Sequence, residues 1–219
     1  MTADRPILVC FAVKEEAAPF RRSWGGDPRV RILITGMGFS NTERAVRSEL
    51  NNMKPCVVIT SGFAGGLNPD WQTGQVVFDA PETPQLAAAL AATGAFAARF
   101  HCATRVAATA DEKRALREST GCDVVEMESG TIREICRSRL IPSLTIRVIS
   151  DAVDENLPLD FNQLMTADQR MDFAKLALAL LKSPGKIPAL MRFQKRLQQA
   201  ANNLAGALDA AIKVQLGIP

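Results

Sequence analysis

The chain has 219 residues and a net charge of +3, with 47% hydrophobic and 22% charged residues. These fractions are typical of globular proteins and exclude a chain that is disordered throughout. No apolar run approaches the roughly 20 residues of a membrane-spanning helix. The first eleven residues lack the pattern of a signal peptide, so we expect a cytoplasmic protein.

The cysteines and the single histidine argue against a metal site and against a catalytic triad. The five cysteines form no C-x-x-C pair and, with the single His101, give no metal-ligand spacing. We therefore expect reduced cysteines and no metal. A hydrolase with a Ser-His-Asp triad is disfavoured, because His101 would have to serve alone.

The charge is uneven along the chain. Residues 182–219 contain six lysines and arginines and one acidic residue, whereas the remainder is slightly acidic. This distribution excludes a generally basic nucleic-acid binder and predicts a local basic tail.

Hydrophobic runs predict alternating strands and helices. In chain order, we expect strands at 7–11, 30–35, 56–61, 75–78, 103–108 and 143–149, and helices at 14–22, 40–53, 84–100, 111–118, 126–140, 168–182 and from Pro188 onward. Ser40 or Asn41 is expected to cap the second helix. The alternation predicts an α/β fold with a central sheet covered by helices on both faces.

Three short motifs follow predicted strands, where such sheets bind ligands. They are Gly36-Met37-Gly38, Gly62-Phe63-Ala64-Gly65-Gly66 and Ser150-Asp151. The first nearly matches a dinucleotide fingerprint, but it lacks the third glycine and the later acidic residue, which disfavours a nicotinamide cofactor. Glycines at such positions still let the backbone approach a ligand closely.

Each acidic motif also has a purely structural interpretation. Glu126-Met127-Glu128 is expected to open a helix, where the helix dipole alone favours acids. Ser150-Asp151 could simply form a turn. Glu16 could lie on a solvated helix face.

Taken together and in this order, the motifs resemble the nucleoside phosphorylase superfamily, especially its methylthioadenosine/S-adenosylhomocysteine nucleosidase branch. The resemblance covers residues 7–182 and rests on ILVCFAVKEEAAPF, ILITGMG, ITSGFAGGLNPDWQTGQVVF, VVEMES and TIRVISDAVD. The last two are the most specific, although Gln75 replaces an acid of the family pattern. The resemblance implies a single-domain, three-layer fold with a central mixed twisted sheet.

The resemblance also implies a role for each motif residue in breaking a purine N-glycosidic bond. Asp151 is the implied general acid at the imidazole ring of the base, and Glu16 the residue that activates water. Glu128 would grip the ribose hydroxyls. The other implied substrate-binding residues are Met127, Glu126, Ser150, Phe63, Ala64, Gly65, Gly38 and Val106.

The nucleophile stays open between water and phosphate. Hexameric phosphorylases of the family place an Arg and a Ser where this chain has Thr60 and Phe63. That difference favours hydrolysis without any cofactor. Phosphate as co-substrate is the alternative, with Arg21, Arg22 or Arg44 supplying the charge.

Two further features bear on the substrate. Only 45 residues separate Phe78 from Val124, fewer than in most relatives, which suggests an open pocket or a bulky substrate. The segment ADEKRALRESTGCDVVEMES and the tail resemble bacterial hopanoid-associated phosphorylases. Adenosylhopane is therefore an alternative to a soluble purine nucleoside, and a non-catalytic nucleoside-binding or membrane-docking protein is a further alternative.

We expect a catalytic domain over residues 1–183, followed by a C-terminal extension. Residues 184–219 predict a basic amphipathic helix, with its apolar side spread over 187–215. It could pack on the body or on a second copy, lie on the inner face of a membrane, or be disordered. We expect a homo-oligomer, with a dimer favoured, and no nucleic-acid partner.

Overall fold

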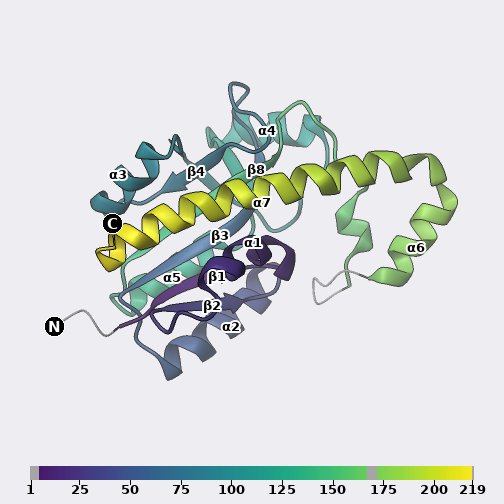
Figure 1. Ribbon diagram of the computed structural model, residues 1–219. Coiled ribbons are helices and arrows are strands. Elements are labelled where there is room, and N and C mark those ends of the chain that lie inside the picture. The colour runs from purple at the N-terminus through teal and green to yellow at the C-terminus, as the bar shows by residue number, and fades with distance from the viewer. Residues whose placement is uncertain (1–4, 167–171, 219) are drawn as a thin grey trace.

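The computed structural model describes residues 5–166 and 172–218 (Figure 1). Within them, eight strands form one mixed sheet: β1 Ile7–Phe11, β2 Val30–Ile34, β3 Val57–Gly66, β4 Val76–Asp79, β5 Phe96–Ala97, β6 Phe100–Cys102, β7 Val124–Glu126 and β8 Ser143–Asp151. The helices are α1 Lys14–Trp24, α2 Phe39–Asn52, α3 Pro84–Ala92, α4 Ala110–Thr120, α5 Ser129–Ser138, α6 Phe173–Lys182 and α7 Ile187–Leu216, with 3-10 turns η1 Phe161–Leu164 and η2 Pro184–Lys186. The predicted α/β class and mixed central sheet are confirmed.

The strand order explains where the motifs meet. The main path runs β2-β1-β3-β8-β4-β5, and β7 pairs with both β3 and β6. β1, β2, β3 and β8 run parallel, while β4 is antiparallel to β8 and β7 is antiparallel to β3. The C-terminal ends of β3 and β8 therefore lie side by side at one edge.

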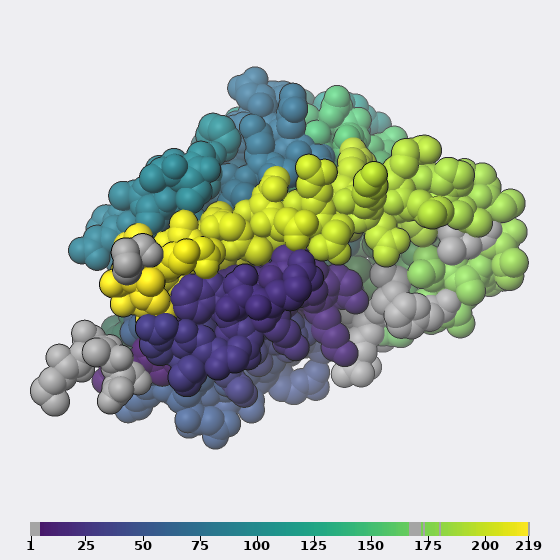
Figure 2. Space-filling view, in the orientation of Figure 1, coloured from purple at the N-terminus to yellow at the C-terminus, as the bar shows by residue number. Residues whose placement is uncertain are grey.

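Both faces of the sheet are covered, as the continuous apolar strands predict. In β1, Ile7, Val9 and Phe11 join the core beneath α1, α3 and α7, whereas Leu8 and Cys10 join the core beneath α2 and α5. Figure 2 shows α7 as a band across the molecule, between the N-terminal elements and α3.

The C-terminal half of α7 is part of the main core. Its buried residues include Ala200, Leu204, Leu208 and Ile212, which pack with residues of α1, α3 and the sheet. Of the alternatives for the tail, packing on the body therefore describes this half of α7, and the division at residue 183 stays a prediction. The sequence pattern alone could not show which surface this apolar side of the helix packs against.

Several expected elements need correction. The predicted helix 84–100 stops at Ala92, because Gly94 adopts a left-handed conformation and β5 and β6 follow. Residues 103–108 form no strand. The helix cap of α2 is Gly38, not Ser40 or Asn41. Part of the predicted helix 168–182 lies outside the described residues.

Candidate active site

The sheet brings the glycine motif of β3 and the Ser-Asp motif of β8 together. Gly65 is paired with Asp151 on one side and with Val125 of β7 on the other. The expected bend at residues 62–66 is instead part of β3, which continues through the glycines with an irregularity between Ala64 and Gly65. A Cβ at Gly62 would meet Arg147 and Glu16, and one at Gly65 would lie 3.7 Å from Asp151 Oδ2, so these glycines leave room for charged side chains.

Arg147 of β8 is the centre of a buried polar cluster. Its guanidinium lies 2.5 Å from Glu126 Oε2 and 3.4 Å from Glu128 Oε2, and it donates to the Ser61 carbonyl and the Thr60 hydroxyl. Arg147 is only 1% exposed. A charge buried this deeply needs paired carboxylates, so the arginine and the two glutamates stabilise one another.

Glu16 of α1 is a third carboxylate of this cluster. One of its oxygens accepts from the Phe63 amide at 2.9 Å, and the other accepts from the Ala12 and Val13 amides. Burial raises the pKa of Glu16, while the nearby Arg147 and the three amides lower it. Glu16 therefore spans α1 and β3 and is not on a solvated helix face.

Gly62 shows how tightly the cluster is packed. Its φ is +143°, and a Cβ there would lie 2.6 Å from Arg147 Nη1 and 2.7 Å from Glu16 Oε1. Both the backbone conformation and the space require glycine at this position.

Glu128 joins the cluster to the first glycine motif. It stands at the N-cap of α5, and its Oε1 accepts from the amide of Gly38 at 3.0 Å. Burial raises the pKa of Glu128 to about 7, opposed by Arg147 and reinforced by Glu126. A carboxylate that titrates near neutrality and reaches toward a glycine turn is suited to ligand binding.

Glu126 has a structural position instead. It ends β7, and its oxygens accept from the amides of Glu128 and Ser129 and from the Ser129 hydroxyl, in addition to the contact with Arg147. It thus caps α5 and compensates the arginine. The acids were expected to open a helix, but Glu126 is strand and Glu128 precedes the first helical turn.

Asp151 lies at the end of β8 with a partner on each oxygen. The Ser150 hydroxyl is 2.5 Å from Oδ1 and 3.1 Å from the Ala64 carbonyl, and Lys113 of α4 forms an ion pair with Oδ2. Burial raises the pKa of Asp151, and Lys113 and Ser150 oppose that shift. Ser150 therefore holds the carboxylate against β3.

Lys113 is fully buried. Besides its ion pair with Asp151, its ammonium donates to the carbonyls of Ala152 at 2.6 Å and Glu155 at 2.7 Å. Three acceptors match the three donors of an ammonium group. The lysine thereby fixes both the Asp151 carboxylate and the loop that follows it.

The remaining predicted residues differ in how closely they approach these acids. On β3, the Phe63 amide contacts Glu16 and the carbonyl of the next residue, Ala64, contacts Ser150. Met127 stands between the two glutamates in the sequence, directly after β7. Val106 is tied through its backbone to the side chain of Asn162, and no contact in the described residues joins it to the carboxylates. No group of three or more His, Cys, Asp or Glu residues among those described could hold a metal.

Comparisons of the sequence with known proteins point to one superfamily. Residues 89–182 match the sequence model of the phosphorylase superfamily. A 5'-methylthioadenosine/S-adenosylhomocysteine nucleosidase of Exiguobacterium is 25% identical over 197 residues, covering 74% of this chain and 84% of the relative. The resemblance to the phosphorylase superfamily is confirmed. The comparisons support an enzyme of the nucleosidase and phosphorylase group.

Solved structures show that the whole fold is shared with this group. Futalosine hydrolase of Helicobacter pylori superimposes with a TM-score of 0.70 at 15% identity, covering 95% of this chain and 97% of that one. A 5'-methylthioadenosine/S-adenosyl homocysteine nucleosidase of Campylobacter jejuni gives 0.69 at 14% identity, covering 98% and 100%. At these identities the likeness establishes the fold, and it includes most of the C-terminal region.

The structure adds two residues that sequence reasoning did not place in the site. They are Arg147 and Lys113, and neither stands in a motif that the sequence assigns to the site. A charged residue inside an otherwise apolar strand, as Arg147 is in SLTIRVI, is a usable signal of a buried ionic partner. Lys113 carries no such signal, because a lysine in the polar helix ADEKRALREST is ordinary.

Proposed function

We propose that the protein hydrolyses the N-glycosidic bond of an adenine nucleoside, with Asp151 as general acid. A buried carboxyl group whose pKa is raised can carry a proton to a purine nitrogen near neutral pH. Ser150 keeps that group oriented toward β3. As the bond breaks, the base leaves with the proton and the sugar becomes cationic.

The carboxylate cluster complements the cationic sugar. Ionised Glu128 can accept hydrogen bonds from two ribose hydroxyls, with Met127 beside it against the ribose. The negative charges of Glu16 and Glu128 favour positive charge developing at the anomeric carbon. The oxygen of the attacking water then adds to that carbon, and Glu16 takes the proton that the water loses.

The charge of the carboxylate cluster around Arg147 is the observation that favours hydrolysis over phosphorolysis. Three buried carboxylates, Glu16, Glu126 and Glu128, surround a single arginine, and Glu126 and Glu128 already pair with its guanidinium. A phosphate ion here would face more negative than positive charge, whereas neutral water would not. Thr60 is bound to Arg147 and supplies no cation of its own.

For the phosphorylase alternative, one arginine is a specific candidate for binding phosphate. Arg21, Arg22 and Arg44 are all exposed, but Arg44 donates to the Asn41 side chain at the start of α2, close in sequence to Gly38. Of the three arginines, Arg44 is therefore best placed to reach an anion at the glycine turn. Phosphate-dependent turnover lost in Arg44→Ala would favour this alternative.

The assignment of Glu16 is tested by Glu16→Gln. We expect kcat for adenine release to fall by about 10²-fold or more, because the amide accepts no proton from water. The measurement is adenine release from methylthioadenosine at saturating substrate, with Glu15→Gln as the matched control on the exposed neighbour. Equal rates for the two variants would remove Glu16 from the mechanism.

Lys113 is proposed as the positioning residue for Asp151. The charged groups facing Asp151 are Lys113, which lowers its pKa, and Glu155, which raises it and is itself paired with Arg196. An acid loses activity as the pH rises through its pKa. Since Lys113 lowers that pKa, Lys113→Met should move the alkaline limb of the kcat/KM profile to higher pH.

The pH profile of Lys113→Met separates positioning from stability. The exposed Lys54→Met serves as control and should leave the limb unchanged. A Lys113→Met variant that is folded and slower, but keeps the wild-type limb, would show that the lysine only supports the loop after Asp151.

The finer identity of the substrate remains part of the proposal. The Exiguobacterium nucleosidase supports an adenine nucleoside with a 5′ thio substituent. The short segment between β4 and β7 leaves a hopanyl substituent as the alternative. We propose that the reaction needs no metal or redox cofactor and that the protein is a homodimer. Light scattering tests the dimer, and nucleoside binding without turnover would favour the non-catalytic alternative.

A further inference from the structure

The α6 helix, η2 and the start of α7 form an arm, defined here as residues 173–196. Figure 1 shows this arm beyond the end of the sheet, and Figure 2 shows it projecting from the body at the end of the α7 band. The remainder of α7 is anchored in the core through its buried C-terminal half. The arm is thus held by a fixed helix while its own surface faces outward.

The arm exposes large apolar side chains. Leu181 is 80% exposed and Met191 65%, and Leu178 and Ile187 are also exposed. These four are half of the eight large exposed hydrophobic residues in the described part of the chain. Their concentration in 24 residues marks an interaction surface, since scattered single residues would need no explanation.

The arm is also strongly basic. It contains six lysines and arginines and no acidic residue: Lys175, Lys182, Lys186, Arg192, Lys195 and Arg196. Arg196 is paired with Glu155, whereas the described ion pairs include none of the other five. Cations interleaved with exposed leucines and a methionine are typical of helices that lie in a membrane interface.

We propose that the arm docks on an anionic lipid bilayer. The leucines and the methionine would enter the acyl boundary while the lysines and arginines meet lipid phosphates. A second copy of the chain fits less well, because a two-fold contact would bring the five cations without a described ion pair in one arm against the same five in the other. A nucleic acid would leave the apolar side chains in water.

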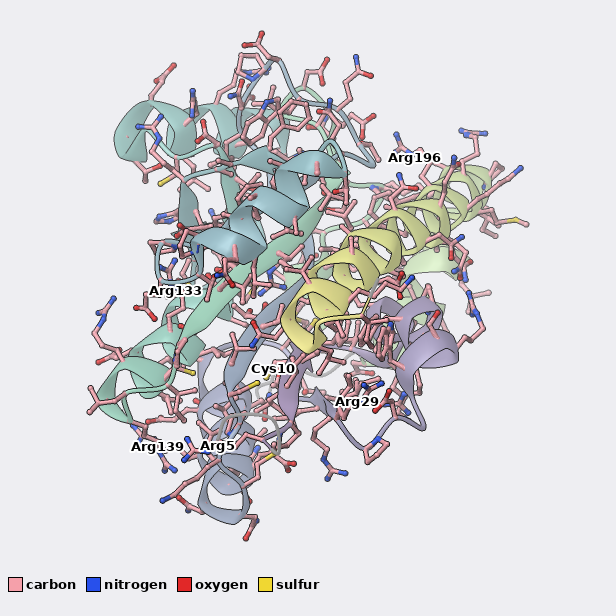
Figure 3. The ribbon with its side chains drawn as sticks, turned by 60° about the vertical axis from the view of Figure 1, so that its left-hand side comes forward. Arg5, Cys10, Arg29, Arg133, Arg139 and Arg196 are labelled. Carbon is pink, nitrogen blue, oxygen red and sulfur yellow. The ribbon has the colours of Figure 1, made fainter. Side chains whose placement is uncertain are left out.

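The arm joins the body at the loop that follows Asp151. Arg196 lies 2.7 Å from Glu155, and the rings of Phe193 and Phe161 are 6.3 Å apart. Arg196, the last residue of the arm, is labelled on α7 in Figure 3. Docking would therefore set the candidate site beside the bilayer surface. This inference goes beyond the proposed function and is tested without turnover.

The test is flotation of the full chain with vesicles of phosphatidylcholine alone or with 30% phosphatidylglycerol. We expect binding to the anionic vesicles only, weakening as salt is raised from about 50 to 500 mM because screening shortens the range of the attraction. Lys182→Gln/Lys186→Gln/Lys195→Gln should reduce partitioning by on the order of 100-fold. Leu181→Ser/Met191→Ser should also reduce it.

Leu140→Ser is the matched control, because Leu140 is 92% exposed but lies outside the arm. It should bind like the wild type, and circular dichroism should show every variant folded. Equal binding to neutral and anionic vesicles, or wild-type binding by both arm variants, would overturn the proposal. So would a dimer in solution that the Leu181→Ser/Met191→Ser variant loses, since the arm would then contact a second copy.

Discussion

Asp151→Asn is expected to lower kcat for adenine release by about 10²- to 10⁴-fold, the range that general acid catalysis typically supplies. The amide keeps the shape of the side chain and can still contact Ser150, but it cannot deliver a proton to the base. The substitution leaves the buried Lys113 ammonium with the Ala152 and Glu155 carbonyls as acceptors but without its carboxylate, so we expect some loss of stability, which urea denaturation measures alongside activity. The measurement is single-turnover adenine release from methylthioadenosine.

Asp154→Asn is the control for this substitution. Asp154 lies three residues further along the same loop and is exposed, so its loss should leave kcat within about twofold. If Asp151→Asn retained wild-type kcat, the general acid would have to be another group, and the account of the site would be wrong.

Arg147→Met has the largest expected effect on stability. It leaves Glu16, Glu126 and Glu128 buried without their shared cation, and breaking a buried pair in this way costs about 3–5 kcal/mol of unfolding free energy. Urea denaturation measures the loss. Arg133→Met is the control, because its pair with Asp79 is partly exposed and should contribute less than about 1 kcal/mol.

The loss of unfolding free energy in Arg147→Met should be smaller at low pH than at high pH. Glu128 has a folded pKa of about 7, raised above its ordinary value, so it stabilises the fold at low pH and that contribution disappears as the pH rises through 7. Without Arg147 the pKa rises further. The variant should therefore be closest to the wild type near pH 5 and furthest from it near pH 8, and a constant difference would contradict the assignment.

The sequence predicts most of the central sheet because its strands are buried on both faces. Ile7–Phe11 and Ser143–Asp151 are almost wholly apolar runs bounded by turns, a pattern that helices on both sides of a sheet require. The short strands β5 and β6 were missed, since an alanine-rich segment has strong helix propensity and only tertiary pairing overrides it.

The candidate site was predictable where residues act through local motifs and not where they act across the fold. Glu16, Glu128 and Asp151 stand in recognisable motifs. The structure places Asp151 at the end of β8, Glu128 just after β7, and Glu16 against the Phe63 amide of β3. Lys113 reaches Asp151 from a helix 38 residues earlier in the sequence, and nothing local in that helix marks it. That Glu126 caps α5 was likewise not predictable, because it depends on where β7 ends.

The most direct test of the central claim is to incubate the pure protein with methylthioadenosine in phosphate-free buffer and to identify both products. We predict free adenine and the unphosphorylated sugar, at a rate that added phosphate does not raise. Turnover that requires phosphate and yields a sugar 1-phosphate would contradict hydrolysis by this carboxylate cluster.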